Sequence, residues 1–272
     1  MRNAKIFGLL AILLLFTGIY KFGGSVWRPA LASISGRSQP LESEDARRQA
    51  GERMMSKLAH AGFKRMPSRI ALLAFKTEKR LELWAENSSA PGIAGEWTYV
   101  QSYPILAASG KLGPKVQEGD RQVPEGIYRI TYLNPNSNFH LSMKLDYPNT
   151  FDRQKAAQDG RTNLGGDICV HGWEVSIGCI AIGNVAIEEI YNLCDKVGRE
   201  NTEVIIAPYD FRKAAPIVKP DAKIRWLPEL YSSIAQELQR FTVSGNSRSA
   251  VKSTGPAPAL RLNAAPAPRS RK

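Results

Sequence analysis

Apolar residues recur at helical spacing in three segments of the 272-residue chain. Segment 41–66 has apolar residues on one side and charged residues on the other, which predicts an N-terminal packing helix. A second amphipathic helix is predicted from Asn184, the expected N-cap, and a third opens at Pro228 within a helical extension at 211–241. The apolar positions are Ala46, Ala50, Met54, Leu58 and Ala61, then Ile187, Ile190, Leu193, Cys194 and Val197, then Leu230, Ile234, Leu238 and Phe241.

Between the first two helices the pattern changes to that of β-strands. Residues 69–86 form two apolar runs joined by a polar turn, which predicts a hairpin. Residues 97–106 continue the β pattern, and residues 125–133 alternate strongly between apolar and polar positions. A closing strand is predicted at 203–211. The predicted fold class is therefore α+β, mainly β, with flanking helices and an N-terminal hydrophobic segment.

Residues 1–24 have the pattern of an export signal. Arg2 and Lys5 precede fifteen mostly apolar residues at 6–20, a length between that of a signal-peptide core and that of a membrane-spanning helix. Residues 30–32, Ala-Leu-Ala, have the form of a cleavage site but lie about ten residues beyond the apolar run. This position favours an uncleaved anchor in the inner membrane, with a cleaved signal peptide as the alternative. Both place the folded part outside the cytoplasm, in the periplasm or cell envelope.

Charge is distributed unevenly along the chain, whose net charge is +12. Residues 1–40, which include a linker at 25–40, carry five basic and no acidic residues, and residues 242–272 carry six and none. The middle of the chain is left with 26 basic and 25 acidic residues, so no basic face for nucleic acid is expected. The segment 242–272 is predicted to be a disordered basic tail, and both tails are expected to contact an anionic membrane or wall polymer.

One cysteine has the surroundings of a nucleophile. In HGWEVSIGC, His171 precedes Cys179 by eight residues, and Ser176 and Gly178 lie between them. A free thiol has a pKa near 8.5, so a working thiolate needs an adjacent base or positive charge, which His171 can supply. Gly178 permits a tight turn that would direct the N–H groups of Gly178 and Cys179 at a developing oxyanion. The alternative is a buried cysteine packed beside a histidine ring.

The other two cysteines, Cys169 and Cys194, either pair with each other or are buried, and their positions in an expected strand and helix favour burial. Three cysteines leave at least one unpaired, and the role of a nucleophile requires Cys179 to be the unpaired one. No spacing resembles a zinc site, so neither a metal nor a cofactor is expected. His60, near the end of the first predicted helix, is expected to be structural or solvated rather than catalytic.

Three segments resemble the YafK-like branch of the L,D-transpeptidase (YkuD) family: GPKVQEGDRQVPEGIYRI at 113–130, LNPNSNFHLSMKLDYPNTFD at 133–152 and ICVHGWEVSIGCIAI at 168–182. The resemblance extends over about 68–210. It implies a β-sandwich or barrel catalytic domain whose cysteine attacks peptidoglycan stem peptides. By the motif, Cys179 would be the nucleophile and His171 the base, and the backbone of Gly172 would help to orient the imidazole.

The chain departs from the common family motif at two positions. Ile177 stands where the wider family has a histidine, and Ala181 stands where it has an arginine, so a local anion contact is missing. Arg161 is the best replacement, because a guanidinium can bind a carboxylate through two hydrogen bonds. The resemblance also places His140 near the cleft. The alternative for Arg161 is a solvated loop charge, and the alternative for His140 is a structural histidine.

The resemblance implies a cysteine acyltransferase that passes a stem peptide to an amine acceptor in cell wall biogenesis and cell shape. Hydrolysis of the same thioester would make the protein an L,D-peptidase or amidase, and a wall-linked lipoprotein is then a further candidate partner. A wall-binding module that has lost catalysis is the alternative of another class. It is disfavoured because Cys179 and His171 are both present.

Overall fold

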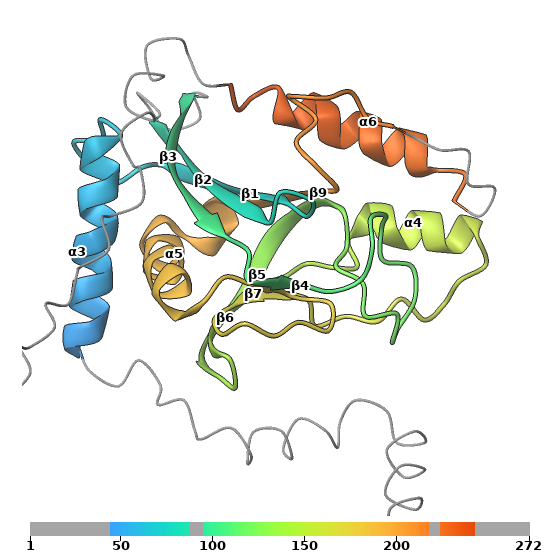
Figure 1. Cartoon of the computed structure of the whole chain (residues 1–272), viewed down its shortest axis with the longest axis horizontal. Helices are drawn as coiled ribbons and strands as arrows, with labels where there is room; N and C mark the ends of the chain where they lie inside the picture. The colour runs from blue at the N-terminus through green and yellow to red at the C-terminus, as the bar shows by residue number, and fades with distance from the viewer. Residues whose placement is uncertain (1–43, 88–94, 218–223, 243–272) are drawn as a thin grey trace, which may run out of the picture.

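The computed structural model describes residues 44–87, 95–217 and 224–242 (Figure 1). The segments expected to form the anchor at 6–20, the linker at 25–40 and the tail from residue 243 lie outside the described residues. Within the described ranges no helix has both the length and the hydropathy needed to cross a membrane.

The described residues form four α-helices and nine strands. The helices are α3 (Glu44–His60), α4 (Thr150–Gln158), α5 (Asn184–Val197) and α6 (Leu227–Leu238). The strands are β1 (Arg69–Phe75), β2 (Arg80–Asn87), β3 (Glu96–Pro104), β4 (Ala107–Ala108), β5 (Gly126–Ser137), β6 (His140–Leu145), β7 (Cys169–His171), β8 (Ile180–Ala181) and β9 (Thr202–Ala207). The predicted α+β class is confirmed.

The nine strands lie in one mixed sheet in the order β3-β2-β1-β9-β5-β6-β7-β8-β4. The pairs β1–β9 and β7–β8 are parallel and the others are antiparallel. The terminal strands β3 and β4 follow each other in the chain, from Pro104 to Ala107, so the sheet is strongly rolled. No ladder between β3 and β4 closes it among the described strands. The sandwich or closed barrel implied by the resemblance is therefore replaced by a rolled, open sheet.

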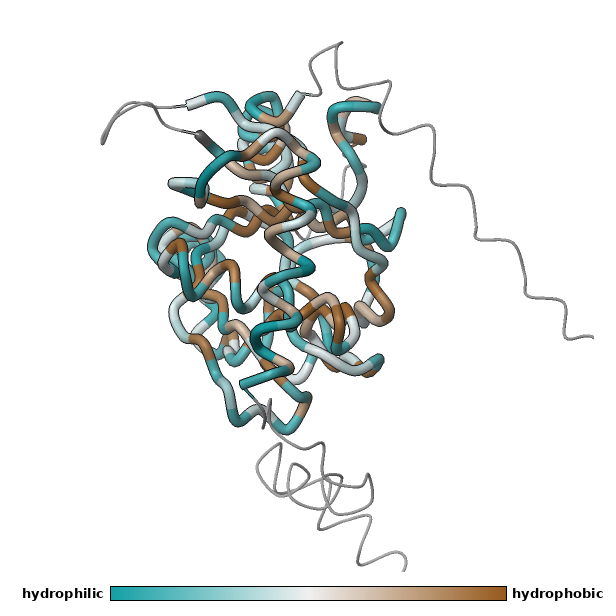
Figure 2. Tube along the Cα trace, turned by 90° about the vertical axis from the view of Figure 1, so that its left-hand side faces the viewer, coloured by the Kyte–Doolittle hydropathy of each residue, from teal (hydrophilic) through white to brown (hydrophobic). Residues whose placement is uncertain are grey.

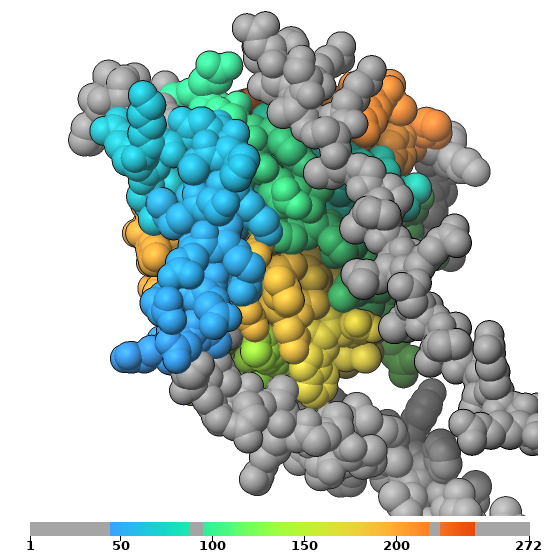
Figure 3. All heavy atoms as spheres, turned by 60° about the vertical axis from the view of Figure 1, so that its left-hand side comes forward, coloured from blue at the N-terminus to red at the C-terminus, as the bar shows by residue number. Residues whose placement is uncertain are grey.

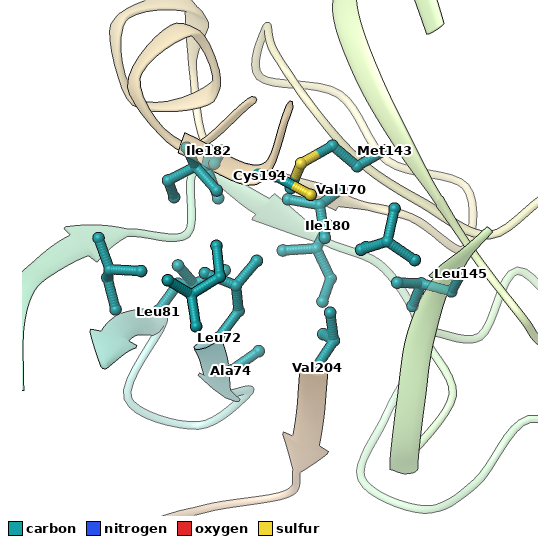
Figure 4. Packing of buried hydrophobic residues seen from close by; sticks show 14 of the residues in the cluster. Leu72, Ala74, Leu81, Met143, Leu145, Val170, Ile180, Ile182, Cys194 and Val204 are labelled. Atoms are coloured by element: carbon teal, nitrogen blue, oxygen red, sulfur yellow. The ribbon is translucent and has the colours of Figure 1, made fainter. Parts of the chain in front are cut away.

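Apolar side chains cover both faces of this sheet. One core cluster packs β1, β2, β6 and β9 against α3 and α5, and Figure 4 shows part of it, with Val204, Ile180 and Val170 close together. The other cluster lies beneath α6, where Ile234 and Leu238 are fully buried. Figure 1 shows α5 and α6 on opposite sides of β1 and β9. In Figure 2 hydrophobic segments run through the body of the molecule, and the projecting loops are largely hydrophilic.

Helix α3 lies along the side of the domain, next to α5 (Figure 3). Its apolar residues Met54 and Leu58 are buried, and its polar side contacts Glu189 of α5, which accepts hydrogen bonds from Arg53 and Lys57. Tyr103 of β3 donates to the same carboxylate at 2.9 Å. The predicted helix at 41–66 is thus present over a shorter range, fixed by packing and by this buried carboxylate.

Candidate functional site

The candidate site lies on one face of strands β6, β7 and β8. In the β6–β7 pair, Ser142 lies opposite His171 and Lys144 lies opposite Cys169. Residues directly opposite each other in an antiparallel pair project from the same face, so these four side chains share one face. The parallel β7–β8 pair aligns His171 with Ala181, and one step before β8 the same register brings Cys179 beside Cys169.

The thiol of Cys179 is half-buried and surrounded by polar groups. The Cys169 N–H donates to Cys179 Sγ at 3.4 Å, and the Asp167 carbonyl lies 3.6 Å from the same sulfur. A hydrogen bond from the Cys169 thiol, followed by the hydrogen bond and charge of His171, holds the pKa of Cys179 well below the ordinary thiol value. Burial acts in the opposite direction but is outweighed. The site therefore favours a thiolate at Cys179.

His171 is buried, and its ring is fixed on two sides. Its Nδ1 lies 2.6 Å from the carbonyl oxygen of Gly172, so Nδ1 carries the proton that it donates there. The ring stacks on Phe139 with centroids 4.6 Å apart, and Phe139 in turn meets Trp173 edge-on. In this tautomer Nε2 is the nitrogen with a free lone pair, which is what a base for the neighbouring thiol requires.

Gly172 occupies a position with no room for a side chain. A Cβ there would lie 2.7 Å from both the Phe139 carbonyl oxygen and Asn184 Oδ1. Asn184 Oδ1 also accepts the Trp173 N–H at 2.9 Å. The predicted N-cap at Asn184 is therefore wrong: Gly183, at φ +80°, is the N-cap of α5, and the Asn184 side chain holds the loop after His171 instead.

Ser176 ties together the loop that carries Cys179. Its Oγ donates to the Cys179 carbonyl oxygen at 2.6 Å and accepts the Ser109 N–H at 3.1 Å. It also accepts the Gly178 N–H at 3.3 Å, so the Gly178 N–H expected to be free has a long hydrogen bond. The Cys179 N–H has no partner among the described residues. Gly178 adopts φ +130°, a conformation that few other residues tolerate.

His140 and Arg161, the two expected substrate contacts, are engaged elsewhere in the structure. His140 Nε2 lies 2.9 Å from Glu188 Oε1 of α5, and Glu188 also pairs with Arg53. Arg161 forms an ion pair with Asp159 at 2.9 Å and donates to a backbone carbonyl, that of residue 116, at 2.8 Å. Neither side chain forms a hydrogen bond or ion pair with Cys179 or His171.

Two neighbours in the same region of the sequence have structural contacts. The Tyr147 hydroxyl donates to the carbonyl of Leu164 inside the core. Asp152 is buried at the start of α4, where it and Asn149 bond each other's backbone N–H groups in a capping box. Burial raises the pKa of Asp152 to about 6.

The three cysteines are all free, and they occupy two separate environments. Cys194 is fully buried in α5, with Sγ 3.2 Å from Thr202 Oγ1, as its apolar position predicted. Cys169 is half-buried beside Cys179 rather than paired with Cys194. Its hydrogen bond to Cys179, together with burial, raises the pKa of the Cys169 thiol. His60 is exposed at the end of α3, where its Nδ1 lies 2.7 Å from the Ser56 carbonyl oxygen.

Sequence reasoning missed several residues of this face. Lys144 presents a partly exposed ammonium group, paired with Asp167 at 2.7 Å. Phe139 packs on the imidazole, Trp173 packs on Phe139, and Cys169 contacts the candidate nucleophile directly. The register of short strands brings Lys144 and Cys169 to this face, so no local sequence signal marks these two residues. Among the described residues, no three His, Cys, Asp or Glu side chains converge to hold a metal ion.

Residues 71–206 match the family described as YkuD, L,D-transpeptidase catalytic domain. The protein named "Putative L,D-transpeptidase YafK" of Escherichia coli (strain K12) is 31% identical over 149 residues, which are 53% of this chain and 56% of that protein. The protein of the same name from Escherichia coli O157:H7 matches equally. The chain thus spans little more than half the length of these curated relatives.

Several solved structures are similar to part of the chain. The helical cell shape determining protein Pgp2 from Campylobacter jejuni aligns with a TM-score of 0.42 and 22% identity, over 57% of this chain and 55% of that chain. Bd1075 of Bdellovibrio bacteriovorus aligns with a TM-score of 0.37 and 21% identity, over 64% of this chain and 55% of that chain.

Proposed function

Because this chain belongs to the L,D-transpeptidase (YkuD) family, as its motifs predicted, we propose that it is a cysteine acyltransferase that modifies peptidoglycan stem peptides. The observation that carries the proposal is the pair Cys179 and His171. The thiol of Cys179 has a pKa well below the ordinary value, and the Gly172 carbonyl holds His171 in the tautomer of a base.

The first half-reaction makes a thioester. Nε2 of His171 takes the thiol proton, and the Cys179 thiolate attacks a stem-peptide carbonyl next to the diamino acid. As the C–S bond forms, the carbonyl electron pair moves onto oxygen; collapse of this adduct breaks the C–N bond. The imidazolium of His171 gives its proton to the departing amine. Phe139 limits rotation of the ring during both transfers, since it stacks on it at 4.6 Å.

Two groups of the loop support this step. The Cys179 N–H has no partner among the described residues, and the Gly178 N–H has only a long bond to Ser176, so both can reach the oxyanion. Each such donor contributes on the order of 3 kcal/mol to the transition state. Ser176 holds these two N–H groups in place through its bond to the Cys179 carbonyl.

We propose that the Lys144 ammonium group, on this face, binds a carboxylate of the substrate. Its ammonium group is partly exposed, whereas Arg161 already binds Asp159. Ala181, at the position of the family arginine, is fully buried next to His171 and carries no charge. A substrate carboxylate would replace the exposed Asp167 as the partner of Lys144.

In the second half-reaction an amine acceptor attacks the thioester, passes a proton to His171 and releases the Cys179 thiolate. Water in place of the amine would make the protein an L,D-peptidase or amidase, which could release a wall-linked lipoprotein. We place the reaction in the periplasm or cell envelope, where peptidoglycan lies. Basic residues in the terminal segments would hold the enzyme to an anionic membrane or wall surface.

The test is incubation of the protein with purified muropeptides, followed by mass analysis of the products. A transpeptidase gives cross-linked or exchanged stems, and a hydrolase gives shortened stems and free amines. Cys179→Ala is the matched control and should give neither. Muropeptides left unchanged by the wild-type chain, in the presence of both donor and amine acceptor, would contradict the proposed function.

A further inference from the structure

Cys169, the first residue of β7, is a neighbour of Cys179, the residue just before β8. The β7–β8 register aligns Val170 with Ile180, and extending this register by one residue places Cys169 opposite Cys179 (Figure 4 shows Val170 beside Ile180). Neighbouring strands lie about 4.8 Å apart. This spacing falls within the Cα separation of roughly 4.4 to 6.8 Å that a disulfide spans.

The contacts of the two thiols agree with this placement. The Cys169 N–H points at Cys179 Sγ at 3.4 Å. Both sulfurs also lie near one acceptor, the Asp167 carbonyl oxygen, at 3.8 Å for Cys169 and 3.6 Å for Cys179. The two sulfurs therefore lie on the same side of the strands, around one shared carbonyl oxygen.

The pair also differs in reactivity in the way that a redox pair requires. Cys179 has thiolate character, so it reacts first with an external disulfide. Cys169 stays protonated until it attacks the Cys179 sulfur of the mixed disulfide. Both residues are only half-buried, so a small reagent can reach them. The third cysteine, Cys194, is fully buried against Thr202 and has no place in this exchange.

We propose that Cys169 and Cys179 form a reversible intramolecular disulfide that switches the nucleophile off in an oxidising environment. The oxidant is a second disulfide, either a small molecule or a protein. The Cys179 thiolate attacks one of its sulfurs, forming a mixed disulfide and releasing one thiolate. Cys169 then loses its proton and attacks the Cys179 sulfur, which closes the internal disulfide and releases the second thiolate. Two protein thiols are oxidised, and one external disulfide is reduced to two thiols.

The experiment treats the full chain with oxidised glutathione and counts thiols by alkylation after denaturation. The count should fall from three to one, and dithiothreitol should restore it. Trypsin cannot map the bond, because no Lys or Arg lies between Arg161 and Lys196. A glutamate-specific protease can, since Glu174 separates Cys169 from Cys179 and Glu188 isolates Cys194. The expected product is a Cys169–Cys179 linked peptide pair.

Two variants sharpen the test. Cys169→Ser should stop at a stable mixed disulfide between glutathione and Cys179. Cys194→Ser is the matched control and should form the same internal bond as the wild type. A stable glutathione adduct on wild-type Cys179, or a bond that includes Cys194, would overturn the proposal. The bond is detected by mass without any substrate, so this result is independent of whether the protein is a transpeptidase.

Discussion

Removal of the Ser176 hydroxyl tests whether the hydrogen bonds of Ser176 stabilise the loop that precedes β8. In Ser176→Ala the Cys179 carbonyl loses a donor at 2.6 Å, and the N–H groups of Ser109 and Gly178 lose an acceptor. The Ser109 hydroxyl, 3.0 Å from Ser176 Oγ, loses its partner as well. A half-buried backbone group without its partner costs about 1 kcal/mol, because water replaces part of the bond. The three backbone groups and the Ser109 hydroxyl should together lower the free energy of unfolding by about 2 to 4 kcal/mol.

The assay is urea unfolding at pH 7 combined with the rate of Cys179 alkylation by iodoacetamide. Ser233→Ala is the matched control, since that exposed hydroxyl donates only to the Glu229 carbonyl within α6. Ser233→Ala should change the free energy of unfolding by no more than about 0.5 kcal/mol. Ser176→Ala should also slow alkylation of Cys179, because a loosened loop weakens the contacts with Cys169 and His171. If both variants unfold at the same urea concentration and react at the same rate, the loop is not held by Ser176.

Three further predictions concern other parts of the domain. Burial raises the pKa of Asp152 to about 6, so the free energy of unfolding should fall by roughly 3 kcal/mol as the pH rises from about 4 through 6. In Asp152→Asn this dependence should be absent, as thermal or urea unfolding across that range would show. Gly172→Ala forces a Cβ to within 2.7 Å of the Phe139 carbonyl oxygen and should cost about 1 to 3 kcal/mol, measured by thermal unfolding. Lys144→Ala should raise KM for stem peptides by roughly tenfold with little change in kcat, whereas Lys144→Arg should largely preserve KM.

Segments with strong local patterns were predicted well from the sequence. The helix from Asn184 and the hairpin at 69–86 follow from hydrophobic periodicity, and both appear in the structure, as α5 and as β1 with β2. The N-cap of α5 was predicted wrongly, because the Asn184 side chain bonds the Trp173 N–H, a contact between segments that no local rule anticipates.

Arrangements that depend on strand order could not be predicted. Strand β9 lies between β1 and β5 in the sheet, far from either in sequence. Strands β7 and β8 have only three and two residues, too few for a periodic signal, yet their register brings Cys169 beside Cys179. The position of Lys144 on the same face also follows from pairing rather than from sequence spacing.

The central claim is that Cys179 carries the acyl group of the stem peptide. The most direct measurement is mass analysis of the full chain after incubation with a stem-peptide donor, acid quenching and digestion. The account predicts an acyl adduct on the peptide that contains Cys179, released by hydroxylamine and absent in Cys179→Ala. Product formation by Cys179→Ala at the wild-type rate, or an adduct located on another residue, would contradict it.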